Sequence, residues 1–164
     1  MKIIQYTTIM NNLKICELVK KKSINYQHKD MSNGRLDNPQ KIYRMLCDVF
    51  QHDKQCEEYL YLLCFNSKYR LLGIFEVSHG TVNMSVCSPR EIFQKALLCN
   101  AVSIILAHNH PSGDTTPSKH DIDFTERVSE AGKMIGVDLA DSIIVGDGTY
   151  YSMTEDGLKK SIKS

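Results

Sequence analysis

Several features that mark membrane or secreted proteins are missing from this sequence of 164 residues. No stretch approaches the roughly 20 apolar residues that a membrane-spanning helix needs, and the first residues lack the apolar core of a signal peptide. Cys-x-x-Cys pairs are missing too, so the six cysteines predict neither a zinc knuckle nor a redox motif. We therefore expect a soluble, cytoplasmic protein with reduced thiols.

An excess of charge of one sign is also lacking, because 20 Lys and Arg residues oppose 19 Asp and Glu residues. Proteins that bind nucleic acid through its phosphates usually carry a basic surface. The single basic run, Lys20-Lys21-Lys22, is interpreted as a solvated surface. We expect any affinity for DNA to be weak and strongly dependent on salt.

The composition, with 42% hydrophobic and 24% charged residues, is typical of one globular domain. We expect a main domain over residues 38–153, preceded by an N-terminal strand and loop in residues 1–37 and followed by a tail over 154–164. Periodicity and capping signals predict helices over 39–50, 88–100 and 118–134, and strands over 13–19, 58–65, 70–77, 81–87, 102–108, 137–145 and 150–153. This order favours the α/β class, with one mixed β-sheet flanked by helices.

Two histidines, His108 and His110, stand two residues apart at the end of an apolar run. Side chains alternate between faces along a strand, so these imidazoles point the same way and can share one divalent ion. A helix is expected to begin after the Pro/Gly turn that follows, with Ser118 as its N-cap. This places Asp121 in the first helical turn, where it is a possible third ligand. Three protein ligands leave a fourth tetrahedral position for water, as in catalytic zinc sites.

Each part of this pattern has an ordinary interpretation when it stands alone. Isolated histidines are often surface or core residues, and Ser-x-x-Asp is a common capping signal. The combination of strand, His-x-His, Pro/Gly turn and Ser-x-x-Asp fits a single geometry, which favours a metal site.

The stretch His108-x-His110-Pro111, with Ser118-x-x-Asp121 beginning seven residues later, resembles the metalloprotease motif of the JAMM/MPN (JAB) superfamily. The string His-Asn-His-Pro-Ser-Gly, with Ser-Pro-Arg-Glu and Asn-Ala-Val-Ser-Ile-Ile upstream, narrows the resemblance to the RadC-like branch, over residues 38–153. The resemblance implies a JAMM/MPN fold similar to that of cytidine deaminases. It also implies one Zn²⁺ ion per chain, held by His108, His110 and Asp121, and a role for Ser118 in hydrogen-bonding the reaction intermediate.

A cytidine deaminase itself would need His-x-Glu followed by Pro-Cys-x-x-Cys, and neither string occurs in the sequence.

The resemblance further implies a glutamate base on an early strand, for which Glu76 is the candidate. Strand alternation places Glu76 on one face with Leu72 and Ile74, and burial there would raise its pKa toward that of a general base. Glu76 could instead face solvent at the strand's end. Glu91 is the second candidate, although a capping box with Ser88 explains it without chemistry.

We therefore predict a zinc-dependent hydrolase, a metallopeptidase or isopeptidase acting on a peptide or protein substrate. Two alternatives are left open. One is a DNA-repair-associated accessory protein with a structural or vestigial metal, and this alternative is weakened because the helix-hairpin-helix region of longer relatives is missing. The other is a metal-dependent nuclease, although nucleases favour paired metals with mainly carboxylate ligands.

Overall fold

One mixed β-sheet forms the centre of the protein in the computed structural model, which describes residues 1–13, 15–29, 34–80 and 87–156. Its strands are β1 (Lys2–Met10), β2 (Cys16–Asn25), β3 (Glu58–Phe65), β4 (Leu71–Gly80), β5 (Ser103–Asn109), β6 (Asp138–Val145) and β7 (Tyr150–Ser152). Their spatial order is β2-β1-β4-β3-β5-β6-β7. The pairs β1–β4 and β5–β6 are parallel, whereas the other neighbours are antiparallel.

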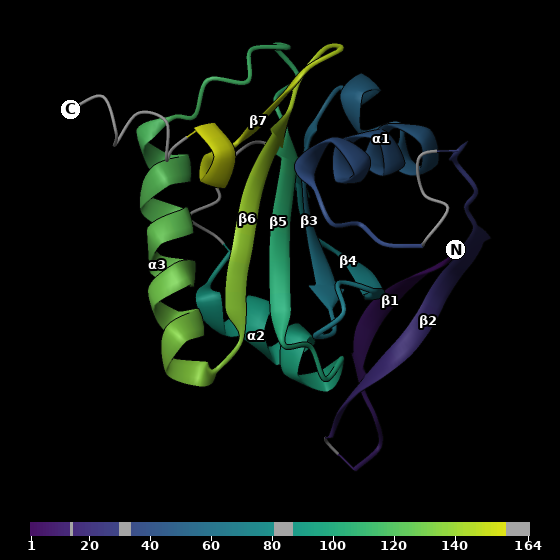
Figure 1. Cartoon of the computed structure of the whole chain (residues 1–164). Coiled ribbons are helices and arrows are strands. Elements are labelled where there is room, and N and C mark those ends of the chain that lie inside the picture. The colour runs from purple at the N-terminus through teal and green to yellow at the C-terminus, as the bar shows by residue number, and fades with distance from the viewer. Residues whose placement is uncertain (14, 30–33, 81–86, 157–164) are drawn as a thin grey trace.

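Helices cover both faces of this sheet (Figure 1). Helix α1 (Pro39–Phe50) packs on the face that carries Leu63 and Ile105. Helices α2 (Pro89–Leu98) and α3 (Lys119–Ile135) pack on the other face, against Leu62 and Leu106. The predicted α/β class with a single mixed sheet is thus confirmed, and the architecture is consistent with a JAMM/MPN-like fold.

Side-chain capping explains where the helices begin. The Asn38 side chain accepts a hydrogen bond from the Lys41 amide at the start of α1. Ser88 and Glu91 form a reciprocal capping box at α2, and Ser118 and Asp121 form one at α3. These local signals are why the predicted helix starts agree closely with the structure.

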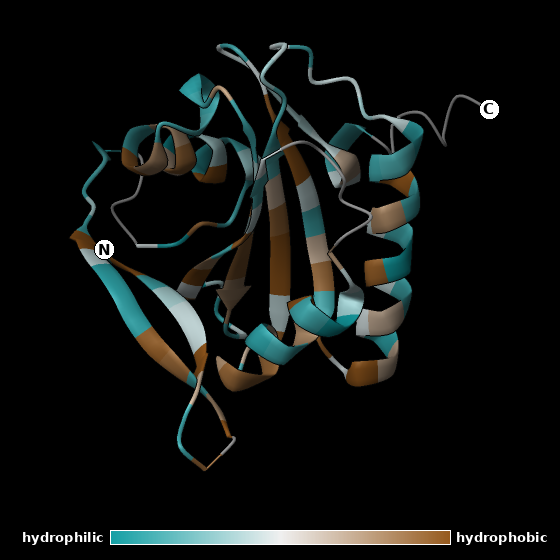
Figure 2. Ribbon diagram, turned by 180° about the vertical axis from the view of Figure 1, so that it is seen from behind, coloured by the Kyte–Doolittle hydropathy of each residue, from teal (hydrophilic) through white to brown (hydrophobic). Residues whose placement is uncertain are grey.

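The central strands are buried on both sides, so they are almost continuously hydrophobic (Figure 2). Every residue of β3 except Tyr59 is buried, and so is every residue of β5 except Ser103. Polar residues stand where β3 begins and where β5 ends, so these two rigid strands hold the backbone of those residues in place.

The N-terminal region differs from the prediction. A single strand over 13–19 was expected; its second half falls in β2, but β2 continues to Asn25 and pairs with the unpredicted β1, and this hairpin joins the main sheet through Gln5 and Tyr6 against β4. Most of β2 is exposed, so its sequence lacks the hydrophobic alternation of a half-buried strand. The strand predicted over 81–87 falls largely outside the described residues.

Within the described ranges, no helix is both long enough and apolar enough to cross a membrane. The six cysteines all lie in those ranges, and none of them forms a disulfide.

Candidate metal centre

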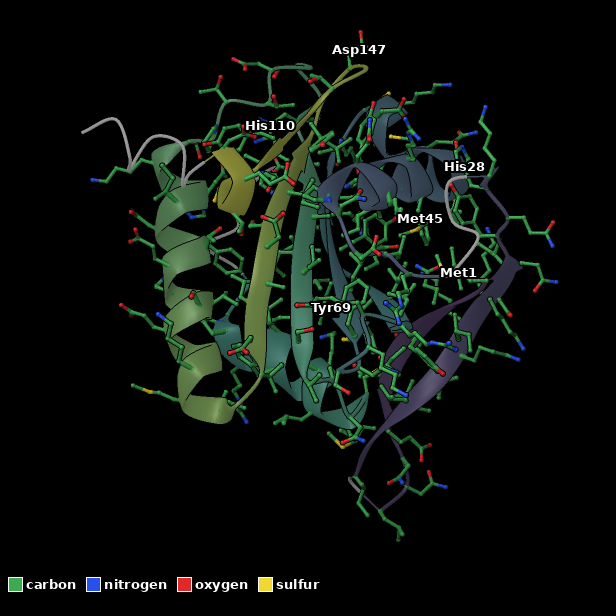
Figure 3. The ribbon with its side chains drawn as sticks, in the orientation of Figure 1. Met1, His28, Met45, Tyr69, His110 and Asp147 are labelled. Atoms are coloured by element: carbon green, nitrogen blue, oxygen red, sulfur yellow. The ribbon has the colours of Figure 1, made fainter. Side chains whose placement is uncertain are left out.

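Strand β5 delivers the two histidines to the end of the sheet. The His108 side chain is 1% exposed and lies on the face covered by α2 and α3, because its strand neighbour Leu106 packs there. The His110 amide donates to the Val145 carbonyl of β6. Figure 3 shows His110 at the same end of the sheet as Asp147, which follows β6.

Helix α3 delivers the carboxylate. The Asp121 amide donates to Ser118 Oγ at 3.2 Å, and the Ser118 amide donates to Asp121 Oδ2 at 2.7 Å. This reciprocal pair holds the Asp121 side chain at the helix start, where it is 2% exposed. Its second oxygen, Oδ1, faces His108.

The three side chains predicted as ligands lie together. His108 Nε2 is 3.1 Å from His110 Nε2 and 3.4 Å from Asp121 Oδ1, and His110 Nε2 is 3.6 Å from Asp121 Oδ2. Ligand atoms around a tetrahedral zinc with bonds of about 2.0–2.1 Å lie about 3.3 Å apart. The separations therefore fit a single ion, and two imidazoles with a carboxylate are a donor set that suits zinc.

Both histidines turn Nε2 toward this centre, and a hydrogen bond fixes the orientation of His110. His110 Nδ1 lies 2.6 Å from the Asp114 carbonyl, which can only accept, so Nδ1 carries the proton and Nε2 presents its lone pair. Burial lowers the pKa of His108 to about 4, so this imidazole is neutral at neutral pH. A neutral imidazole is the form that binds metal.

Asp121 is ionised in this setting. Burial acts to raise its pKa, but the neighbouring His110 and His108 imidazoles and the hydrogen bond from the Ser118 amide outweigh burial and hold the pKa of Asp121 below its usual range. Conversely, the Asp121 carboxylate, 3.6 Å from Nε2, raises the pKa of His110.

A residue that was not predicted for the site, Glu58, completes the cluster. Glu58 begins β3, is 9% exposed, and offers a carboxylate oxygen that lies, with the ring nitrogens of His108 and His110, in a group no wider than 4.8 Å. These three residues are close enough to hold a metal ion. Glu58 Oε1 is buried and has no hydrogen-bond partner among the described residues, so it is poised to bind a group that is not part of the protein.

Burial also changes the acidity of Glu58. It raises the pKa to about 7, the charge on His110 opposes this increase, and the carboxylate of Asp121 adds to it. The signal in the sequence was an acidic residue at the first position of an otherwise apolar strand, buried except at Tyr59, where a charge is costly unless it has a function.

Glu76 does not join this cluster. It lies opposite Tyr61 in the β3–β4 register, and the Tyr61 side chain packs on the α1 face of the sheet. The Glu76 carboxylate is 3.0 Å from His79 Nδ1 and 3.7 Å from Lys21 Nζ. Glu76 shares a face with Ile74 as predicted, but not with Leu72, which packs on the other face because the β3–β4 register shifts between Cys64 and Phe65. The face of Glu76 is opposite to the one that carries His108.

Glu91, the second candidate for the base, accepts a hydrogen bond from the Ser88 amide at 3.2 Å as part of its capping box.

A surface cleft of about 490 Å³ opens over the cluster. Glu58, His110, Ser118 and Asp121 all line it, so three of the predicted residues and the unpredicted glutamate face one space. His108 is buried beneath them. The arrangement can therefore combine metal binding, a carboxylate base and a hydroxyl group around one bound molecule.

Comparison of the sequence with known proteins shows the family to which this chain belongs. Residues 36–158 match the RadC-like JAB domain. Two similar proteins are both named UPF0758 protein: one from Clostridium tetani is 42% identical over 127 residues, and one from Clostridium botulinum strain Okra is 43% identical over 130 residues. A third, from Clostridium acetobutylicum, is 38% identical over 131 residues.

These alignments cover 77%, 79% and 80% of this chain, but only 55%, 56% and 56% of the respective relatives. The chain thus spans little more than half the length of the relatives it matches. It belongs to the RadC-like JAB domain family, as the motif predicted.

Proposed function

We propose that this protein is a zinc-dependent hydrolase that cleaves amide bonds in a peptide or isopeptide substrate. The observation that carries the proposal is the buried Glu58 carboxylate beside His108 and His110, with one oxygen that has no partner in the described structure. Family membership supports hydrolase chemistry in general.

The side chains fit the roles that such hydrolysis needs. His108, His110 and Asp121 would hold the ion, since their separations match a tetrahedral centre. A bound zinc ion supplies Lewis-acid polarisation of the scissile carbonyl and lowers the pKa of water.

Glu58 replaces Glu76 as the proposed base. Its carboxylate takes a proton from the attacking water while the water oxygen forms a bond to the carbonyl carbon. As the carbon–nitrogen bond breaks, Glu58 returns the proton to the departing amine nitrogen, so the base is regenerated. Glu76 lies on the far face of the sheet and cannot reach the same molecule.

Ser118 is proposed to stabilise negative charge on the reacting carbonyl oxygen. Its Oγ accepts a hydrogen bond from the Asp121 amide through a lone pair, so the hydroxyl proton can be donated toward the cleft. Preorganised donors of this kind lower the barrier because they need no rearrangement when charge develops.

Amide hydrolysis is favoured over cleavage of nucleic acid for two reasons. Phosphodiester hydrolysis commonly uses two metals held mainly by carboxylates, whereas this cluster offers two imidazoles around one position. The net charge of +1 also provides no broad positive field for a polyanion.

A screen of zinc-loaded protein against peptide and isopeptide libraries, with and without chelator, tests the proposal. Hydrolysis should require the metal, and Glu58→Gln should lower kcat by about 10²–10⁴-fold. Glu76→Gln is the matched control and should leave kcat unchanged. Full activity in Glu58→Gln, or hydrolysis that survives metal removal, would overturn the proposal.

A further inference from the structure

Asn109, the residue between the two histidines, has a buried side chain that the proposed reaction does not use. It is 2% exposed, and strand alternation points it to the face opposite His108. A buried side-chain amide is normally hydrogen-bonded, so its partners indicate its structural role.

The Asn109 amide binds the backbone on both sides of Glu58. Its Oδ1 accepts from the Tyr59 amide at 2.8 Å, and its Nδ2 donates to the Glu57 carbonyl at 3.0 Å, with a longer contact of 3.5 Å to the Gln55 carbonyl. A backbone amide needs an acceptor and a carbonyl needs a donor, so these partners fix which end of the side chain is oxygen.

This contact begins where the ladder between β3 and β5 ends. The last register pair is Leu60 with His108, and continuing the register would set Tyr59 opposite Asn109. The Asn109 side chain therefore takes over from the strand backbone and extends the attachment of β3 to β5 past Glu58. On its other side, Glu58 lies opposite Gly80 of β4.

We propose that Asn109 is a positioning residue that holds Glu58 against the two histidines. The tripeptide His108-Asn109-His110 would then do two things at once: its outer residues bind the ion, and its middle residue fixes the base. This inference rests on the proposed function, because it takes Glu58 to be the base. A displacement of about 1 Å in a reacting group can cost about 10²-fold in rate, so such fixing matters.

Asn109→Ala tests this role, with Asn66→Ala as a matched control. Asn66 also accepts two backbone hydrogen bonds through Oδ1, from Lys68 at 2.9 Å and Arg70 at 3.1 Å, but it does so in the β3–β4 turn, away from the metal cluster. Both variants lose a side chain that accepts hydrogen bonds from the backbone. Only the change at Asn109 should affect the chemistry.

In Asn109→Ala we expect a kcat about 10–100-fold below wild type with KM unchanged. Zinc affinity, measured by competition with a chelator, should stay within about threefold, since the ligands are retained. The Tyr59 amide should exchange with solvent faster, because it has lost its acceptor. On a Glu58→Gln background the same change should cause no further loss of kcat.

Asn109→Asp is the second variant, and it decides the question if the alanine variant does not fold. It keeps an acceptor for Tyr59 but cannot donate to the Glu57 carbonyl, so an intermediate kcat is expected. Crystal structures of the zinc-loaded variants add a measurement without substrate. They should show the Glu58 carboxylate displaced from His110.

The outcomes separate the two proposals. Wild-type kcat or an undisplaced Glu58 in Asn109→Ala, while Glu58→Gln is inactive, would overturn the role of Asn109 alone. An active Glu58→Gln would overturn the role of the base, and with it the reason for holding Glu58 in place.

Discussion

Leu60 of β3 lies directly opposite His108 of β5, and both side chains are directed to the α2 and α3 face of the sheet. Glu58 comes two residues before Leu60, so alternation brings its carboxylate to the same face and the same end as the histidines. This register brings Glu58 into the group of side chains around the candidate metal site. It also separates Glu76 from the cluster, since Glu76 aligns with Tyr61 on the other face.

Ser118→Ala should reveal a structural contribution that is separate from any chemistry. Loss of the N-cap should lower the free energy of unfolding by about 1 kcal/mol, measured by urea denaturation of zinc-free protein. The affinity for zinc should also fall, because Ser118 Oγ no longer fixes the Asp121 backbone amide and the Asp121 carboxylate is then held only by the Ser118 amide.

Ser88→Ala is the control for that measurement, since Ser88 forms the same kind of capping box at α2. It should cost similar stability and leave zinc affinity unchanged. Equal zinc affinity in both variants would show that the Ser118 cap does not orient Asp121.

The proximity of His108, His110 and Asp121 could be predicted because the parts of the motif are local. His108 and His110 are separated by one residue of a strand, and Ser118 and Asp121 by one helical turn, so standard geometry fixes each pair. The sequence also contained the start signals of α1, α2 and α3. Those signals act within three or four residues and do not depend on the rest of the fold.

The place of Glu58, the proposed base, could not be predicted in the same way, because it depends on strand pairing across the sheet. Glu58 is 50 residues before His108, and only the β3–β5 register brings them together. Glu76 had the expected alternation, but nothing in its local sequence specifies which face meets α2 and α3. The β1–β2 hairpin was missed for a related reason: β2 is mostly exposed, so pairing rather than hydrophobic pattern defines it.

His52→Phe should reduce the sensitivity of the fold to acid. His52 belongs to the short 3₁₀ helix η2 (His52–Lys54) and is fully buried. Its ring lies edge-on to the Tyr61 ring, with 5.0 Å between the ring centroids. Burial, and secondarily His108, lowers the pKa of His52 to about 3. An unfolded histidine titrates near 6.5, so between these values the unfolded chain binds the extra proton and stability falls as pH falls.

Zinc-free protein should therefore lose about 2 kcal/mol more than His52→Phe when the pH is lowered from 7 to 5. Urea unfolding of both proteins at both pH values measures the difference. The same loss in wild type and variant would show that His52 does not control this dependence.

Gly146→Ala should disturb the loop that supports His110. A Cβ at this position would meet the Gly113 carbonyl and would lie 2.6 Å from Thr115 Cγ2, on either side of the Asp114 carbonyl that binds His110. Overpacking of this kind costs about 1–3 kcal/mol of stability. Because the loop has to shift, zinc affinity should fall as well.

Gly132→Ala serves as the comparison, since its Cβ would lie 2.5 Å from the Val137 carbonyl, between α3 and β6. It should destabilise the protein without weakening the metal site. A loss of zinc affinity as large as that in Gly146→Ala would show that the effect is only general destabilisation.

The zinc content of purified, zinc-loaded protein tests the central claim most directly. Elemental analysis should find one zinc ion per chain in wild type and in Glu58→Gln, and none in His108→Ala/His110→Ala. Circular dichroism should show all three proteins folded, because the hydrophobic clusters on both faces of the sheet do not depend on the ion. Equal zinc in wild type and in the folded double variant would contradict the account.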